Sequence, residues 1–207
     1  MRKTHILIVS LILLTNIVNA QIKFGFKEGV NLSTQSEPGM LWNNNDIKTG
    51  FTLGVVFDYR FHNKLSLQTE VNYKRTGLAY EKEETHSNLK IKRDYDYYNI
   101  PLFLKCRFNN ELGLNQNWSV SFYGGPYYSY LLKANLEIEK NGQTTVSDYK
   151  SQSNLSDWGV IMGGEVARIF TNGELFADIR YEMGLTDVSK SENIKNKVIG
   201  IGIGYRF

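Results

Sequence analysis

Alternation of apolar and polar residues runs through nearly the whole chain after its first 20 residues, and it limits the folds open to this protein. In residues 51–61 the odd positions are apolar or aromatic, whereas the even positions include Thr52, Asp58 and Arg60. A period of two is typical of strands with one apolar and one polar face. It recurs in eight segments: residues 22–32, 51–61, 65–73, 95–108, 117–136, 156–170, 174–186 and 197–207. We therefore expect an all-β fold.

The connections between these segments alternate in length. Short turns are expected at residues 62–64, 109–116 and 171–173, and long polar loops at residues 34–49, 81–94, 137–154 and 187–196. Long loops at one end and short turns at the other are typical of outer-membrane barrels. This pattern predicts an eight-stranded antiparallel up-and-down transmembrane β-barrel.

Composition excludes several other classes. A mean hydropathy of −0.35 excludes a bundle of transmembrane helices. One Cys excludes an intramolecular disulfide and a Cys-rich zinc site. The formal net charge is +3, and it falls to +1 without Arg2 and Lys3, so we expect no nucleic-acid partner.

The N-terminus carries the features of a secretory signal peptide. Arg2 and Lys3 precede the apolar run 6–14, and small residues stand at positions −3 and −1 before a cleavage point after Ala20. Nine helical residues cover only about 14 Å, half of a bilayer core. We predict a cleaved signal peptide at residues 1–20 and an outer-membrane barrel domain at residues 21–207.

Alternation alone does not distinguish a membrane barrel from a soluble ligand-binding barrel. Eight glycines on the polar faces, including Gly202 and Gly204, favour a crowded interior over a solvated surface. Aromatic residues near the strand ends predict two interfacial girdles. The predicted interface residues are Phe24, Phe61, Phe108, Trp118, Tyr130, Trp158, Phe170 and Phe207. These features favour the membrane barrel.

Short motifs in order along the chain resemble the PorT-like outer-membrane β-barrel family of Gram-negative bacteria. They are FGFKEGVNLS at 24–33, GFTLG at 50–54, LQTEVNY at 67–73, YNIPL at 98–102, GPYYS at 125–129 and RYEMGLTDV at 180–188. The resemblance implies a small eight-stranded barrel in the outer membrane and little about activity. The terminal Phe207 likewise resembles the signal read by barrel-assembly machinery.

The polar face of the predicted barrel carries many charges. In an eight-stranded barrel these side chains point into a lumen that they nearly fill. Buried charges must pair, so we predict a structural network that plugs the lumen. Its predicted members are Lys23, Lys27, Asp58, Arg60, Glu70, Lys105, Arg107, Glu165, Asp178, Arg180, Glu182 and Arg206.

Catalytic signals are weak. His86 stands beside Ser87 after Glu83 and Glu84, which would allow lipid acyl chemistry, but catalytic triads are assembled by geometry rather than by adjacency. His62 falls in a short turn, and too few ligands exist for zinc. We predict no catalytic residue, no metal and no cofactor.

We therefore predict a non-enzymatic outer-membrane protein with a plugged lumen, whose external loops serve binding, adhesion or envelope structure. Its expected partners are outer-membrane lipid, the barrel-assembly machinery through Phe207, and an extracellular or envelope protein of unknown identity. A narrow porin-like channel is the alternative, and a lipid-modifying barrel enzyme is a third.

Overall fold

The computed structural model describes residues 22–36, 47–84, 87–109, 112–113, 115–140 and 142–207. The predicted signal peptide lies outside these residues and stays a prediction. Most of the predicted loop 34–49 and His86 also lie outside them. Within the described residues, no helix is long and apolar enough to cross a membrane.

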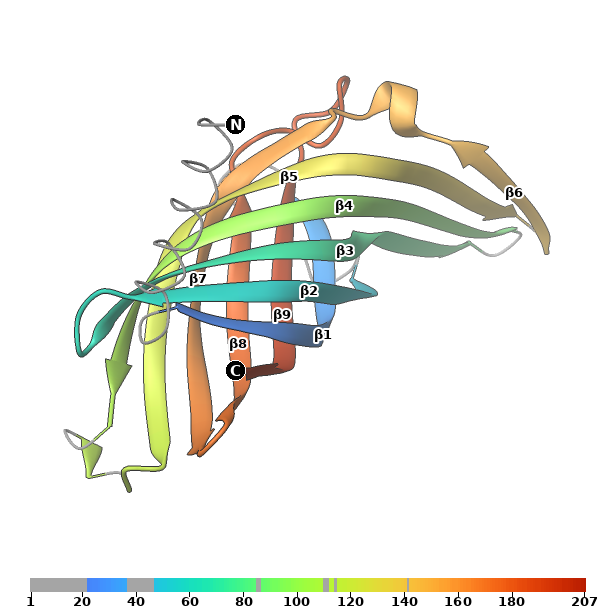
Figure 1. Cartoon of the computed structure of the whole chain (residues 1–207). Coiled ribbons are helices and arrows are strands. Elements are labelled where there is room, and N and C mark those ends of the chain that lie inside the picture. Colours follow the sequence, from blue (N-terminus) through green and yellow to red (C-terminus); the bar gives the residue numbers. More distant parts are fainter. Residues whose placement is uncertain (1–21, 37–46, 85–86, 110–111, 114, 141) are drawn as a thin grey trace, which may run out of the picture.

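Eight strands close into a barrel, as the alternation predicted. The described strands are β1 (Ile22–Ser36), β2 (Lys48–Arg60), β3 (Leu65–Glu84), β4 (Ser87–Phe108), β5 (Trp118–Lys140), β6 (Gln143–Asp148), β7 (Ser156–Phe170), β8 (Gly173–Gly184) and β9 (Lys195–Arg206). All except β6 form an antiparallel ring, which the pairing of β1 with β9 completes (Figure 1). β6 pairs with β5 alone among the described strands.

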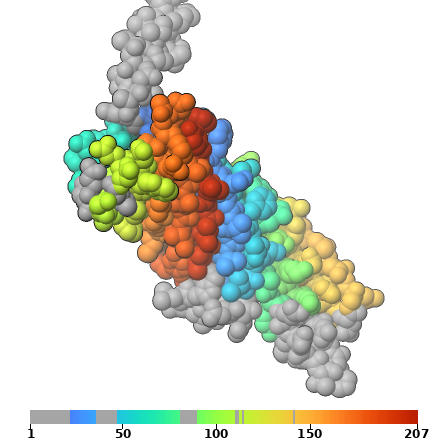
Figure 2. Space-filling model, turned by 90° about the horizontal axis from the view of Figure 1, so that it is seen from below, coloured from blue at the N-terminus to red at the C-terminus, as the bar shows by residue number. Residues whose placement is uncertain are grey.

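The barrel is inside-out relative to a soluble protein. The charged side chains of Lys27, Glu70 and Lys105 are buried, whereas Phe122 and Ile201 are 59% and 63% exposed. The face formed by β8, β9, β1 and β2 lies toward the viewer in Figure 2 (orange, red, blue and cyan). Apolar side chains on the outside require lipid around the barrel. The soluble ligand-binding barrel is therefore wrong.

Two of the predicted long loops are largely strand. Within residues 81–94, β3 and β4 pair from Glu81↔Lys90 onward up to the tip of their hairpin; within residues 137–154, β5 runs on to Lys140 and returns as β6. These strands rise beyond the membrane, where water wets both faces, so no apolar parity is required. The alternation signal therefore stops where the bilayer ends, although the hydrogen-bonded ladder continues.

A β-bulge reverses the side-chain parity of β5. Tyr97 of β4 pairs with Leu131 and its neighbour Asp96 pairs with Lys133, so Leu132 is the extra residue. Past the bulge Ala134 is fully buried, although its even number predicts a lipid-facing position. One inserted residue is enough to reverse the faces of a strand, because the side-chain period is two.

Candidate functional site

In outer-membrane barrels the short turns face the periplasm and the long loops face outward, which defines a periplasmic and an extracellular end here. The periplasmic end of the lumen is organised around one carboxylate. Glu174 of β8 accepts ion-pair contacts from Lys23 at 3.1 Å, Arg107 at 3.0 Å and Arg206 at 2.8 Å. The Glu174 side chain is fully buried. Three strands other than β8 supply these cations, so the carboxylate ties β1, β4 and β9 to β8 across the lumen.

The next layer is built on Lys105 and Arg206, both of which are fully buried. Lys105 Nζ lies 2.7 Å from Glu165 and 3.7 Å from Asp58. Arg206 also pairs with Glu165, and its guanidinium lies 3.5 Å from Asp58. Every charge in this layer therefore has a partner of opposite sign, which offsets the cost of its burial.

Arg180 forms the centre of a third layer. Its guanidinium donates two hydrogen bonds of 2.9 Å to the two carboxylate oxygens of Glu70 and a third of 2.9 Å to Asp178. Asp178 also accepts from Lys27 at 2.8 Å and from the Tyr123 hydroxyl at 2.5 Å. Such a bidentate arginine–carboxylate pair fixes orientation as well as charge.

At the extracellular end of the lumen Lys74 pairs with Glu182. Beside them Asp157 accepts hydrogen bonds from Tyr127 at 3.1 Å, Asn196 at 3.0 Å and Thr186 at 3.0 Å. The polar network thus continues from the periplasmic turns to the outer rim.

The predicted lumen residues are brought together with one exception. Eleven of the twelve join ion pairs with other lumen charges, whereas Arg60 is half-buried and joins no ion pair among the described residues. Three charged members of the network, Lys74, Asp157 and Glu174, were missed although their parity places them on the polar face. The aromatic lumen residues Phe103 and Phe176 were missed because aromatics were assigned to the girdles alone.

Packing fills the space that the charges leave. The guanidinium of Arg206 stacks 4.2 Å from the Phe176 ring centroid, and a Cβ added at Gly204 would lie 2.3 Å from that ring. A Cβ at Gly202 would meet the Lys27 side chain at 2.5 Å. A cavity among Lys27, Arg180 and their neighbours measures about 10 Å³, at the lower limit for one water molecule. This part of the lumen is closed to solutes.

A cap covers the inner face of the strands above the lumen. Tyr95, Tyr97 and their buried neighbours form an apolar cluster with Tyr149 from the β6–β7 connection and Val188 from the β8–β9 connection. The two connections meet at the Ser153↔Ser189 bridge. The extracellular mouth is thus covered by chain as well as filled from within.

One exposed ion pair fastens this cap to the barrel. Arg93 of β4 donates hydrogen bonds of 2.6 and 3.1 Å to the two carboxylate oxygens of Glu192, and its guanidinium lies 5.2 Å from the Tyr149 ring centroid. Hydrogen bonding to Arg93 lowers the pKa of Glu192. A lowered carboxyl pKa stabilises the folded cap above the ordinary pKa of about 4.3, and the effect is lost as pH falls through the folded-state value.

Replacing Glu192 with glutamine should therefore loosen the β8–β9 connection at neutral pH. Acidification of the wild type through the lowered pKa of Glu192 should have the same effect. Hydrogen exchange of residues 187–194, corrected for intrinsic rates, should rise several-fold. The matched control is Glu137→Gln, which removes the Lys92–Glu137 pair elsewhere on the sheet. Equal exchange in E192Q and wild type would show that the ion pair does not hold the cap.

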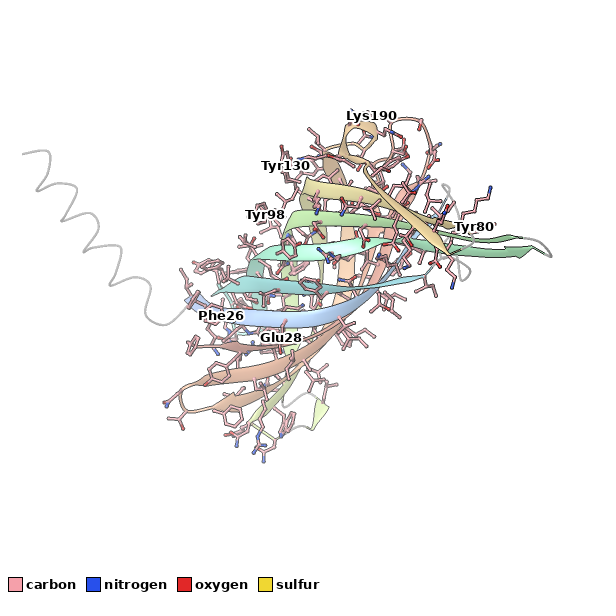
Figure 3. All side chains as sticks on the ribbon, turned by 90° about the vertical axis from the view of Figure 1, so that its right-hand side faces the viewer. Phe26, Glu28, Tyr80, Tyr98, Tyr130 and Lys190 are labelled. Carbon is pink, nitrogen blue, oxygen red and sulfur yellow. The ribbon has the colours of Figure 1, made fainter. Side chains whose placement is uncertain are left out.

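The predicted interface aromatics lie on the outer face at the two ends of the barrel. Seven are exposed, and Phe108 is partly buried. Phe24 contacts Phe207 with ring centroids 6.1 Å apart at the periplasmic end, and Trp158 contacts Tyr128 at 4.6 Å near the other end. Figure 3 labels two exposed tyrosines of the outer face, Tyr98 and Tyr130.

Beyond this outer row of aromatics, strands β3 to β6 form a sheet that projects from the barrel (Figure 1). This projecting sheet comprises residues 77–84 of β3, 87–94 of β4, 135–140 of β5 and all of β6. Lys92 and Glu137 join β4 to β5 at 3.0 Å, and Arg75 forms a bidentate pair with Asp96 at its base. All six residues of β6 are exposed.

No curated protein sequence matches this chain. Among solved structures, the attachment invasion locus protein Ail of Yersinia pestis is 18% identical, over 90% of this chain and 99% of Ail, with a TM-score of 0.44. Neisserial surface protein A is 16% identical, over 89% of this chain and 97% of that protein, with a TM-score of 0.46. OprG of Pseudomonas aeruginosa is 14% identical, over 91% of this chain and 96% of OprG, with a TM-score of 0.47.

A family model described as outer membrane protein beta-barrel domain matches residues 19–190, which is most of the chain. The inside-out barrel has the architecture that this description requires. The chain therefore belongs to the outer membrane protein beta-barrel domain family and is an integral protein of the outer membrane.

Proposed function

We propose that this protein is a binding module of the outer membrane, and that its projecting sheet captures an extended polypeptide segment of an external partner. The observation that carries this proposal is the edge strand β6. Its far side has no strand partner among the described residues, and Val146 is 62% exposed. An unpaired edge offers backbone donors and acceptors to an added strand. The filled lumen supports binding rather than transport.

The hairpin geometry indicates which backbone groups would bind. Lys140 pairs with Gln143 across a two-residue turn. In such a hairpin the pair next to the turn is hydrogen-bonded, and the following pairs alternate. The N–H groups of Thr144 and Val146 should therefore point to the free edge. Proline at either position would remove one donor from that edge and leave the ladder to β5 intact.

This proposal can be tested with a labelled peptide copying residues 133–140 (KANLEIEK), which contains residues 135–140, the strand segment that β6 already pairs with on its other side. The refolded protein should bind it, and Val146→Pro should weaken binding about tenfold, whereas Ser147→Ala should not. Cells that display V146P should also adhere more weakly to surfaces coated with matrix proteins than cells that display the wild type or S147A. Binding of the peptide that is equal in wild type and V146P would contradict strand addition.

Three narrower proposals accompany this function. The motifs at 24–33 and 180–188 support a place among the PorT-like barrels. The terminal Phe207, exposed beside Phe24, is proposed as the residue that barrel-assembly machinery reads; slower assembly of Phe207→Ala would support this, and unchanged assembly would contradict it. We also propose that the protein is not an enzyme, and a changed lipid profile that depends on His86 would contradict this.

A further inference from the structure

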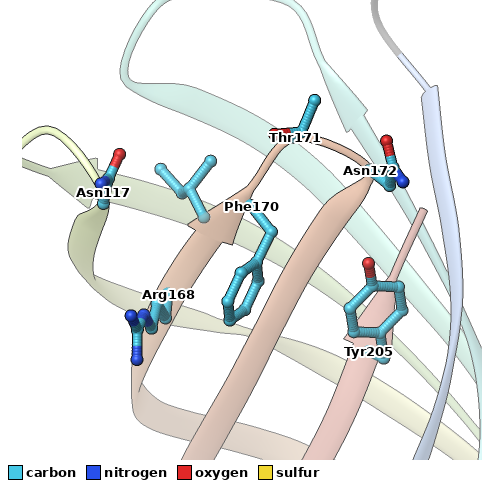
Figure 4. Close-up of a pocket in the computed structure, with 7 residues that line it drawn as sticks. Asn117, Arg168, Phe170, Thr171, Asn172 and Tyr205 are labelled. Carbon is cyan, nitrogen blue, oxygen red and sulfur yellow. The ribbon is translucent and has the colours of Figure 1, made fainter.

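A groove opens on the outside of the barrel at its periplasmic end. It lies beside the turn between β7 and β8 and has a volume of about 800 Å³. Figure 4 shows the residues that line it: Asn117, Arg168, Ile169, Phe170, Thr171, Asn172 and Tyr205. The lining combines one cation with amide, hydroxyl and aromatic groups and contains no carboxylate.

Arg168 is the single charged residue of this lining. It lies on the lipid-facing side of β7 and is exposed, unlike the buried lumen arginines. Its guanidinium carbon lies 5.7 Å from the ring centroid of Trp118 and 5.2 Å from that of Phe170. Among the described residues no carboxylate forms an ion pair with it. The two aromatic rings hold the guanidinium in place while its hydrogen-bond donors stay available.

The depth of Arg168 in the membrane follows from these same aromatics. Trp118 and Phe170 belong to the periplasmic row of interface residues, and aromatic belts lie at the level of the lipid headgroups. Arg168 therefore lies at the level of the lipid phosphates. A planar guanidinium matches a phosphate with two parallel hydrogen bonds, and the side chains of Asn117, Thr171 and Asn172 offer further polar groups in the same groove.

We propose that this groove binds the phosphate of an anionic phospholipid in the periplasmic leaflet, with Arg168 as the principal ligand. The acyl chains of that lipid would lie along the apolar outer face above Phe170, and its headgroup would reach the polar turn at Thr171 and Asn172. The site is independent of the projecting sheet, which lies at the opposite end of the barrel.

Trp118 offers a local reporter of such a lipid. In a W42F/W158F background, its fluorescence can be quenched by phosphatidylglycerol or phosphatidylcholine carrying dibrominated acyl chains in vesicles. We expect phosphatidylglycerol to associate at Trp118 about five-fold more strongly than phosphatidylcholine, since one basic residue near a membrane surface contributes on that order. Arg168→Gln should abolish this preference, and Arg168→Lys should retain part of it.

Lys133→Gln is the matched control, because Lys133 is an exposed cation on the extracellular side. It should keep the full preference, and heat-modifiable migration on a gel should verify that each variant is folded. Equal quenching by the two lipids in the Arg168 protein, or a preference that survives R168Q, would overturn the proposal. Loss of the preference on adding millimolar inorganic phosphate would assign the groove to a soluble anion and would overturn the lipid assignment.

Discussion

Replacing Arg180 with methionine should lower the free energy of unfolding by about 3–5 kcal/mol, the usual loss when one partner of a buried ion pair is removed. The change would leave Glu70 buried without its bidentate partner and would remove one of the donors to Asp178. It would also remove the stacking of the guanidinium on Phe103 and Tyr123. Urea unfolding of the refolded barrel in lipid vesicles, followed by tryptophan fluorescence, would measure the difference.

Two further variants separate burial from charge. The double variant Glu70→Gln with Arg180→Met should be less destabilised than R180M alone, because it no longer buries an unpaired carboxylate at Glu70. Lys92→Met breaks a partly exposed pair and should cost less than about 1 kcal/mol. If R180M and K92M were destabilised equally, the lumen pairs would not be the buried network described above.

Replacing Glu28 with leucine should have the opposite effect and stabilise the protein in a bilayer by about 1–2 kcal/mol, because an acidic side chain on the lipid face of a barrel is destabilising. Glu28 is exposed on the outer face of β1, and its Cα partners are Leu53 and Ile203 (Figure 3). It lies four residues from Phe24, about 10 Å into the membrane for a tilted strand. A hollow of about 600 Å³ with a mostly apolar lining surrounds it.

Val30→Glu is the matched control, since Val30 is the next lipid-facing residue of the same strand and is 57% exposed. It should destabilise the barrel by a similar amount. Both variants are compared with wild type by their urea midpoints in the same vesicles. A midpoint for E28L at or below that of the wild type would place Glu28 in contact with a polar partner rather than with lipid.

The barrel could be predicted from sequence because lipid imposes a single rule on every spanning strand. Alternation in β2 assigns Asp58 to the inside and Phe57 to the outside, and the structure has both there. Outside the membrane that rule no longer applies, so the extensions of β3, β4 and β5 and the strand β6 read as loops. The bulge at Leu132 could not be predicted either, because one inserted residue leaves the local composition unchanged.

Which lumen charges pair with one another could not be predicted from the sequence, for a different reason. Lys27 and Asp178 are 151 residues apart and meet only because the strand register and the barrel closure place them together. Parity predicts that both side chains point inward, but it does not predict their positions along the barrel axis. Glu28 is the opposite case. Its parity assigns its side chain to the lipid face, and its charge alone gives no indication of that position.

The most direct test of the filled lumen is a conductance measurement on the refolded wild-type protein in a planar bilayer. Paired charges such as Arg180 and Glu70, with about 10 Å³ of free space beside them, predict no steps above the protein-free baseline across a range of salts. Stable, ohmic steps whose number rises with the amount of protein would contradict this and would favour a channel over a binding module.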